Sequence, residues 1–212
     1  GRIYYVDSAG SDATGDGSQA RPWCTVRYAA SQVAAGDTVL INPGTYEGGI
    51  VVETSGRADA PITFRGNGPG AVVEGSGGER DAFFVTGADY IMVENLTIRH
   101  ANRAGIRISW SDHVTVRACT LADNETWGVF TDFSDYTLIE NCESYGAGRE
   151  HGIYISNSSD YPTIRSNRLH HNYACGLHMN GDASMGGDGL ISGALVEQNI
   201  IYANGQGGGS AI

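Results

Sequence analysis

The chain has 212 residues, a formal net charge of −11, 31 glycines and 13 basic residues, and every basic residue is an arginine. The absence of lysine excludes Schiff-base chemistry, a P-loop lysine and a lysine general base. The acidic charge argues against nucleic acid and anionic membranes as partners, because both bind basic surfaces. No apolar run approaches the roughly 20 residues of a membrane-spanning helix, so we expect a folded protein without a membrane span.

Residues 1–50 differ from the rest of the chain and form an entrance segment. Residues 3–6 alternate as a strand does, and a polar, glycine-rich turn follows them. Residues 27–35 are rich in alanine and amphipathic, and they end at Gly36, so they predict the single helix of the chain. A helix placed before a stack of strands can cover the open apolar end of that stack. We therefore predict an N-terminal capping helix.

A short segment with β-branched residues recurs along the rest of the chain. Its copies begin at Val93, Val116, Ile139, Ile164 and Val196, so the spacings are 23, 23, 25 and 32 residues. A second block keeps the same register, with copies at residues 104–108, 127–131, 151–155 and 175–179 and an incomplete copy at 209–212. Coils of about 20–25 residues made only of short strands predict a right-handed parallel β-helix. We expect one all-β domain over residues 1–212, with its coils in 51–212 and the last coil incomplete.

Equivalent residues of stacked coils should form ladders, because neighbouring strands lie about 4.8 Å apart. Four asparagines are expected at the corner between two strands or one residue after it: Asn95, Asn141, Asn167 and Asn199. An asparagine there can satisfy its own backbone and that of the neighbouring coil. Cys119 and Cys142 are expected to stack inward, either within disulfide range or as free thiols that pack as small apolar groups.

The entrance segment contains several short motifs that together resemble a known group. They are Tyr4-Tyr5-Val6, Gly10-Ser11-Asp12, Asp16-Gly17-Ser18, Pro22-Trp23, Gly36-Asp37-Thr38-Val39 and Pro43-Gly44-Thr45-Tyr46. The segment is similar to that of secreted bacterial β-helix proteins, a group that includes pectate-lyase-like polysaccharide lyases. This resemblance implies an extracellular or cell-surface protein that acts on, or holds, polysaccharide. The chain opens with Gly1 and not with Met, as expected if a signal peptide has already been removed.

The C-terminal end of the stack is expected to be uncapped, because the sequence stops at Ile212 inside a repeat. Solenoids need polar capping repeats at their ends. We therefore expect either a truncated fragment, a second chain or a dimer contact that covers this end.

The second block of the repeat carries the candidate active site. Alternation places one outward ladder at Arg107, Phe130, Tyr154 and His178, beside a ladder that contains Asp132. Aromatic rings and a guanidinium suit sugar stacking and carboxylate recognition, and a tyrosine, a histidine and carboxylates suit proton transfer. Alternatively, the aromatic residues only cover the strands and pack under loops. The predicted catalytic residues are His178, Tyr154, His151, Asp132 and Asp182, and the predicted substrate-binding residues are Arg107, Phe130, Asn180 and Glu150.

The longest spacing contains an insertion, residues 180–189, directly after the strand of His178. Asp182 and Asp188, with Asn180 and backbone carbonyls, could supply oxygen ligands to Ca²⁺. The alternative is a glycine-rich turn in which the aspartates cap the backbone. We predict calcium as the candidate cofactor and expect no organic cofactor.

The first block offers a competing outward site that contains Glu143, Tyr145, Arg168, His170 and His171. The resemblance implies that pectate-lyase-like enzymes bind substrate along such a face, with a lysine or arginine base beside calcium. Lysine is absent here, so arginine, histidine or tyrosine would have to serve as the base. His170 and His171 would form a metal pair only on the same face, yet adjacent residues of a strand point to opposite faces, so we interpret the pair as a turn feature.

The predicted function is a secreted polysaccharide-active enzyme, either a lyase that performs β-elimination on an acidic glycan or a glycoside hydrolase. In the lyase, His178 or His151 is the base, Tyr154 the acid, and Arg107 or a metal neutralises the substrate carboxylate. The alternative is a non-catalytic carbohydrate-binding or surface-adhesion β-helix. Charge repulsion between an acidic protein and an acidic glycan favours calcium bridging or a neutral glycan.

Overall fold

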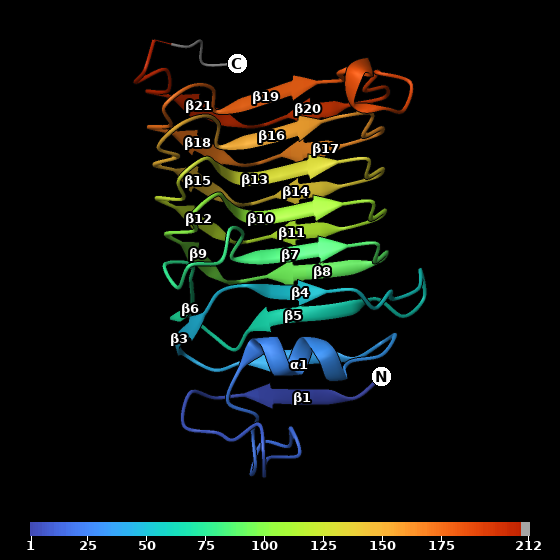
Figure 1. Ribbon diagram of the computed structural model, residues 1–212, viewed down its shortest axis with the longest axis vertical. Helices are drawn as coiled ribbons and strands as arrows, with labels where there is room; N and C mark the ends of the chain where they lie inside the picture. Colours follow the sequence, from blue (N-terminus) through green and yellow to red (C-terminus); the bar gives the residue numbers. More distant parts are fainter. Residues whose placement is uncertain (209–212) are drawn as a thin grey trace.

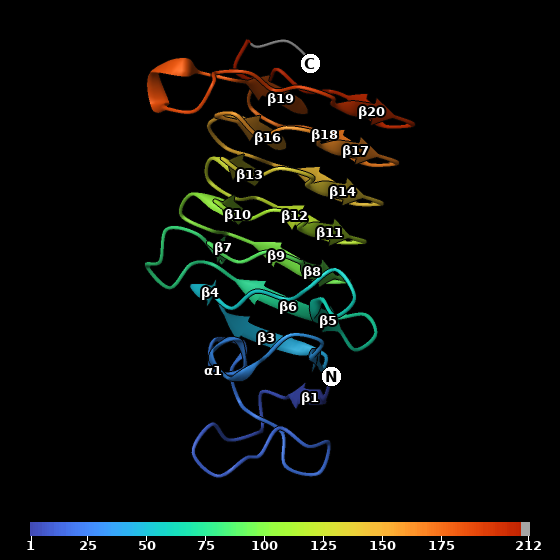
Figure 2. The ribbon, with the colours of Figure 1, turned by 90° about the vertical axis from the view of Figure 1, so that its right-hand side faces the viewer.

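The computed structural model describes residues 1–208. Three sheets of parallel strands wind into a solenoid, and most coils give one strand to each sheet (Figures 1 and 2). The prediction of an all-β, right-handed parallel β-helix is confirmed. The predicted fifth copy of the second block, at 209–212, lies outside the described residues.

Each sheet forms one wall of the solenoid, and its strands follow one another in chain order. The eight-stranded sheet contains β1 (Ile3–Val6), β2 (Thr38–Ile41), β5 (Ile62–Gly66), β8 (Ile91–Glu94), β11 (Thr115–Arg117), β14 (Leu138–Glu140), β17 (Thr163–Arg165) and β20 (Leu195–Glu197). The six-stranded sheet contains β4 (Ile50–Val52), β7 (Phe83–Thr86), β10 (Ala104–Ser109), β13 (Trp127–Asp132), β16 (Ile153–Ser156) and β19 (Leu177–Asn180). The seven-stranded sheet contains β3 (Gly44–Glu47), β6 (Ala71–Glu74), β9 (Thr97–Arg99), β12 (Thr120–Ala122), β15 (Glu143–Tyr145), β18 (Arg168–His170) and β21 (Ile200–Tyr202).

The inward side chains of all three sheets form one continuous core. Ile98 pairs with Leu121 across β9 and β12, and both side chains are fully buried. Each such aliphatic side chain contributes about 1.5–3 kcal/mol when it leaves water. Cys119 and Cys142 stack in the same core as free thiols, with the Cys119 N–H 3.5 Å from the Cys142 sulfur.

The corner between the eight- and seven-stranded sheets needs a left-handed backbone. Asn95 and Asn141 lie at this corner, as predicted, and adopt φ values of 54° and 53°. Asn167 follows the corner and points inward, where its Oδ1 accepts the Cys142 N–H at 2.9 Å. Its Nδ2 donates to the Ile139 carbonyl and to Oδ1 of Asn199, both at 3.0 Å. The predicted satisfaction of neighbouring coils by asparagine is therefore confirmed.

A second asparagine ladder lies at the far end of the seven-stranded sheet and was not predicted. Asn172 accepts the Ala147 N–H at 3.1 Å, and its Nδ2 donates to the Ser144 carbonyl and to Oδ1 of Asn204. Asn124 makes the equivalent contact with the Ala101 N–H at 3.0 Å. The signal was present in the sequence, because asparagine recurs at the same place in three repeats.

Alternating charges stabilise the outer face of the eight-stranded sheet. The ladder runs through Arg65, Glu94, Arg117, Glu140 and Arg165, and its hydrogen bonds measure 2.5–3.0 Å. Burial raises the pKa of Glu140, but hydrogen bonds from Arg165 and Arg117 outweigh it, so the pKa lies below its usual value. This face is therefore occupied by structural ion pairs.

The helix α1 spans Val26–Gln32 and is shorter than the predicted 27–35. Thr25 caps it, because the Thr25 hydroxyl oxygen accepts the Tyr28 N–H at 3.1 Å. The helix packs against β4 and β1, so in the first coil it continues the wall of the six-stranded sheet (Figure 1). It thus protects the edge of β4 with buried Val26 and its alanines.

Apolar side chains are exposed at the opposite end of the described stack. In the described chain, β19, β20 and β21 are the last strands of their sheets. Leu195, Val196 and Ile200 are exposed there. A hollow of about 370 Å³ opens between Leu177, Met179 and Val196.

Candidate functional site

The predicted outward ladder exists on the six-stranded sheet. The register pairs Arg107 with Phe130, Phe130 with Tyr154 and Tyr154 with His178 across β10, β13, β16 and β19. Figure 1 shows these strands side by side across one face of the molecule. Phe84 of β7 continues the ladder below Arg107. Side chains from consecutive coils thus meet on one surface.

Trp127 is the residue of this surface that the sequence reasoning missed. Its ring stacks on Phe130, with centroids 4.4 Å apart, and Phe130 is consequently only 9% exposed. Phe130 and Tyr154 meet edge to face at 5.4 Å. The ring surface open to a ligand therefore belongs to Trp127 and Tyr154. The signal was the position of Trp127, directly before the glycine of the second block.

His151, His178 and Glu150 gather at the start of β16 and β19. The two imidazoles stack with centroids 4.5 Å apart. The Cys175 N–H donates to Nδ1 of His151 at 3.1 Å, so the proton of the neutral imidazole sits on Nε2. Glu150 accepts the Trp127 indole N–H at 2.7 Å, and its carboxylate lies 3.8 Å from that Nε2. The Nε2 of His151 thus lies near the Glu150 carboxylate but beyond hydrogen-bond distance.

Burial and the charge of the neighbouring His178 lower the pKa of His151 to about 4. The unfolded chain binds a proton there as the pH falls below about 6.5, whereas the folded chain does not. Stability should therefore decline between pH 6.5 and 4. His151→Asn keeps an acceptor for the Cys175 N–H without titrating. The free energy of unfolding is measured with urea at pH 7 and at pH 4.5. Its decrease between these two pH values should be roughly 1–2 kcal/mol smaller in the variant than in the wild type. An equal decrease in the two proteins would contradict the lowered pKa of His151.

Arg107 and Asp132 form an ion pair on the same sheet. The guanidinium lies 3.3 Å from an oxygen of Asp132 and 4.9 Å above the centre of the Phe84 ring. Ser109 accepts from Nε of Arg107 at 2.9 Å, and its hydroxyl donates to Asp132. Within residues 1–208 the side-chain hydrogen bonds of the Asp132 carboxylate go to these two residues, so it orients the guanidinium and not the imidazole of His178.

The insertion after β19 begins with a short 3₁₀ helix, Ala183–Met185. Asp182 caps it and accepts the Ser184 N–H at 2.9 Å, which lowers the pKa of the Asp182 carboxyl, with the largest effect from the Ser184 hydroxyl. Asp188 accepts the Leu190 N–H at 2.9 Å. Asn180 donates from Nδ2 to the Tyr154 hydroxyl at 3.4 Å, which brings the start of the insertion to the site.

Both aspartates of the insertion therefore cap their own turns. In the described part of the chain, no group of three or more histidine, cysteine, aspartate or glutamate side chains could hold a metal ion. Calcium binding by Asp182 and Asp188, with Asn180 and backbone carbonyls as further oxygen ligands, stays a prediction.

The competing face on the seven-stranded sheet differs from expectation in one respect. The strand β18 ends at His170, and His171 adopts a left-handed φ of 51°. The turn brings both rings to the same side, with their Nδ1 atoms 2.8 Å apart. Nε2 of His170 lies 3.0 Å from Glu143, and its ring lies between Tyr145 and Tyr202. The pair is thus a turn feature, as predicted, and strand alternation does not apply to it because β18 ends at His170.

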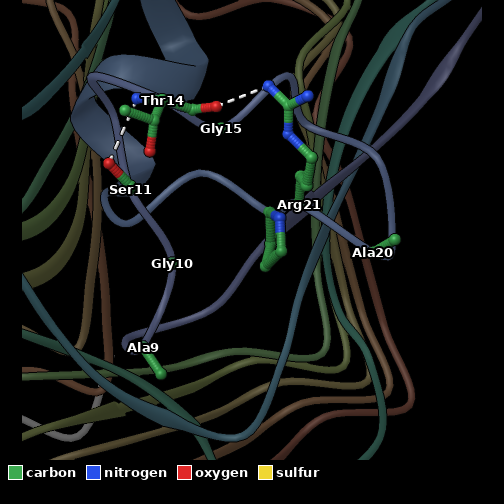
Figure 3. Close-up of a pocket in the computed structure, with 8 residues that line it drawn as sticks. Ala9, Gly10, Ser11, Thr14, Gly15, Ala20 and Arg21 are labelled. Atoms are coloured by element: carbon green, nitrogen blue, oxygen red, sulfur yellow. Dashed lines mark hydrogen bonds between the residues drawn. The ribbon is translucent and has the colours of Figure 1, made fainter.

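A separate hollow of about 210 Å³ lies in the N-terminal loop, away from the six-stranded sheet (Figure 3). The Arg21 guanidinium donates to the Thr14 carbonyl at 2.6 Å and forms an ion pair with Asp16 at 3.7 Å. The Thr14 N–H donates to Ser11. Since the single charged side chain of the lining serves the loop itself, this hollow belongs to the turn architecture.

Comparison with known proteins gives several matches. Residues 4–148 match the family described as "Pel9A-like, right handed beta helix region". The uncharacterized protein YwoF of Bacillus subtilis (strain 168) is 28% identical over 170 residues, which are 80% of this chain and 29% of that protein. The chain therefore spans less than a third of the length of this relative.

Solved structures with the same fold include two polysaccharide lyases. A pectate lyase Pel9A superposes with a TM-score of 0.83 at 21% identity, over 97% of this chain and 55% of that one. An alginate lyase from Paenibacillus sp. str. FPU-7 gives a TM-score of 0.68 at 22% identity, over 96% and 80% of the two chains. At these identities the likeness shows the fold.

Within residues 1–208, no helix has the length and apolar character needed to cross a bilayer.

Proposed function

Because the chain belongs to the Pel9A-like right-handed β-helix family, we propose that the outer face of its six-stranded sheet binds and cleaves a polysaccharide. The observation that carries this proposal is the meeting of Trp127, Tyr154, His151 and His178 on consecutive coils, with Glu150 held beside them. Exposed rings bind the apolar faces of sugars, and the histidines and the tyrosine can move protons.

The reaction that these groups fit is β-elimination. His178 takes the proton from the carbon next to the substrate carboxylate, and the electron pair forms a double bond as the glycosidic C–O bond breaks. Tyr154 donates its proton to the leaving oxygen, with its hydroxyl held by Asn180. His151 stays neutral above its lowered pKa of about 4 and can donate from Nε2. Hydrolysis through Asp132, Glu150 or Asp182 is the alternative chemistry on the same face.

A second candidate function is non-catalytic binding of a neutral glycan. It is favoured by Arg107, whose charge is matched by Asp132 at 3.3 Å and by Asp81 at 3.9 Å. A guanidinium paired with two carboxylates attracts a substrate carboxylate less than an unpaired one does. The net charge of −11 acts in the same direction.

An assay of products separates these functions. The protein is incubated with acidic and neutral polysaccharides, with calcium or with a chelator, while unsaturated-uronate absorbance and new reducing ends are recorded. The lyase proposal expects both signals together. Reducing ends without absorbance would replace the lyase by a hydrolase, and binding without either signal would leave the binding function.

The proposed setting is extracellular or at the cell surface, where polysaccharide is available. We further propose that the exposed apolar end at β19, β20 and β21 is covered in the working protein by a longer chain of which this sequence is a fragment, by a second chain or by a dimer contact. The exposed Leu195, Val196 and Ile200 support this, because such groups are normally buried.

A further inference from the structure

The corner between the six- and eight-stranded sheets repeats a four-residue pattern that the proposed function does not use. The pattern reads Gly87-Ala88-Asp89-Tyr90, Trp110-Ser111-Asp112-His113 and Phe133-Ser134-Asp135-Tyr136, and it ends with Ser159-Asp160-Tyr161. Its last positions, from Tyr90 to Tyr161, form a stack of four rings with centroids 4.6–4.9 Å apart. Rings stacked in this way present only their edges to solvent.

The first position of the pattern is different, because one ring face is left open. Trp110 stacks on Phe133 with centroids 4.2 Å apart and is nevertheless 64% exposed. On its other side the preceding coil has Gly87, where an added Cβ would meet no atom within 4 Å. Gly187 of the insertion lies beside Phe133 and closes the opposite end of the pair. One face of the indole therefore borders a position without a side chain.

The backbone at this empty position matches that of its neighbours. Gly87, Trp110 and Phe133 have φ values of 59°, 51° and 49°. Gly87 therefore occupies a regular position of a ladder whose next members carry rings. The space where its ring would lie is about as thick as the spacing between coils, about 4.8 Å. A flat ring can lie against the indole there.

The surrounding charges indicate which ring fits. Asp89 and Asp112 lie at the same corner, and each accepts the backbone N–H of the next coil at 2.8 Å through Oδ1. Carboxylate oxygens can accept further hydrogen bonds from hydroxyl groups. The four copies of the pattern contain four aspartates and no arginine. Burial, followed by the charges of Asp112, Asp160 and Asp188, raises the pKa of Asp135, as expected in a negative environment.

We propose that the open face of Trp110 above Gly87 is a subsite for a neutral pyranose residue of a polysaccharide. The apolar face of the sugar lies on the indole, and its hydroxyl groups donate to Asp89 and Asp112. A uronate is disfavoured because its carboxylate would face the row of aspartates. Trp110 directly follows Ser109, the last residue of β10, so the subsite borders the face of the proposed function but needs no catalysis.

Three variants test the subsite. Trp110→Ala removes the platform. Gly87→Phe fills the empty position with a ring in the left-handed backbone that Trp110 and Phe133 already adopt. Tyr161→Ala is the matched control, because Tyr161 is also exposed at this corner but lies between Tyr136 and Gly193. Thermal unfolding confirms that each variant is folded.

Binding is measured in every variant by isothermal titration calorimetry, with xylohexaose, cellohexaose and an oligogalacturonate as probes. In the proteins that retain Trp110, NMR of its indole N–H resonance locates the bound probe. A neutral probe is expected to shift the Trp110 resonance of the wild type. Its affinity should fall at least about tenfold in Trp110→Ala and in Gly87→Phe but not in Tyr161→Ala. Unchanged affinity in the first two variants, no binding of either neutral probe, or a preference for oligogalacturonate would overturn the subsite.

The same experiment keeps this proposal separate from the proposed function. His178→Ala should leave the Trp110 shift unchanged while any product formation is lost. If the wild type forms products and His178→Ala does not, while both keep the Trp110 response, both proposals are supported. If the wild type shows the Trp110 response but forms no products, only the subsite is supported.

Discussion

Replacing Asn167 by alanine is expected to lower the free energy of unfolding by about 2–4 kcal/mol. The side chain is 1% exposed, and it bonds the Cys142 N–H, the Ile139 carbonyl and Asn199. The variant would leave buried backbone groups of two coils without partners, and each such group costs about 1–3 kcal/mol. Urea denaturation followed by circular dichroism measures the effect.

Asn141→Gly is the control for this prediction. Asn141 occupies the exposed left-handed corner at φ 53°, a conformation that glycine adopts without steric cost. It should therefore change stability by less than about 0.5 kcal/mol. If both variants lost the same small amount, the inward asparagine ladder would not be a principal source of stability.

The largest expected effects on activity are at Tyr154 and His178. If the face performs β-elimination, Tyr154→Phe and His178→Ala should each lower kcat/KM by about 10²–10⁴-fold, because each removes one proton transfer. Initial rates of unsaturated-uronate formation on the preferred polysaccharide measure this.

Tyr145→Phe is the matched control, since Tyr145 is an outward tyrosine on the seven-stranded sheet, stacked on His170. Its rate should remain within about twofold of the wild type. A large loss in Tyr145→Phe, with little change in the other two variants, would move the active site to the seven-stranded sheet.

The repeats were sufficient to predict the fold and the register of the outward ladder. Alternation along the second block placed Arg107, Phe130, Tyr154 and His178 in one row, and the strand pairs have that register. This works because a parallel β-helix converts sequence periodicity directly into neighbouring side chains. The same property made the corner positions of Asn95 and Asn141 predictable, but not their left-handed φ values.

Contacts within the site depend on features that periodicity does not contain. The stacking of Trp127 on Phe130 depends on ring orientation, and the pairing of Asp132 with Arg107 depends on a guanidinium reaching across one coil. The turn at His170 and His171 was predicted, but the approach of their two rings was not, because it depends on the left-handed φ of His171. Alternation predicts the face of a side chain but not its partner.

The central claim is that the outer face of the six-stranded sheet is where polysaccharide binds. Backbone amide shifts during titration with the preferred oligosaccharide test it most directly. The account predicts that the largest changes occur in β10, β13, β16 and β19, with the ion-paired eight-stranded sheet unaffected. Changes concentrated on β8, β11, β14 and β17, or on β15 and β18, would contradict it.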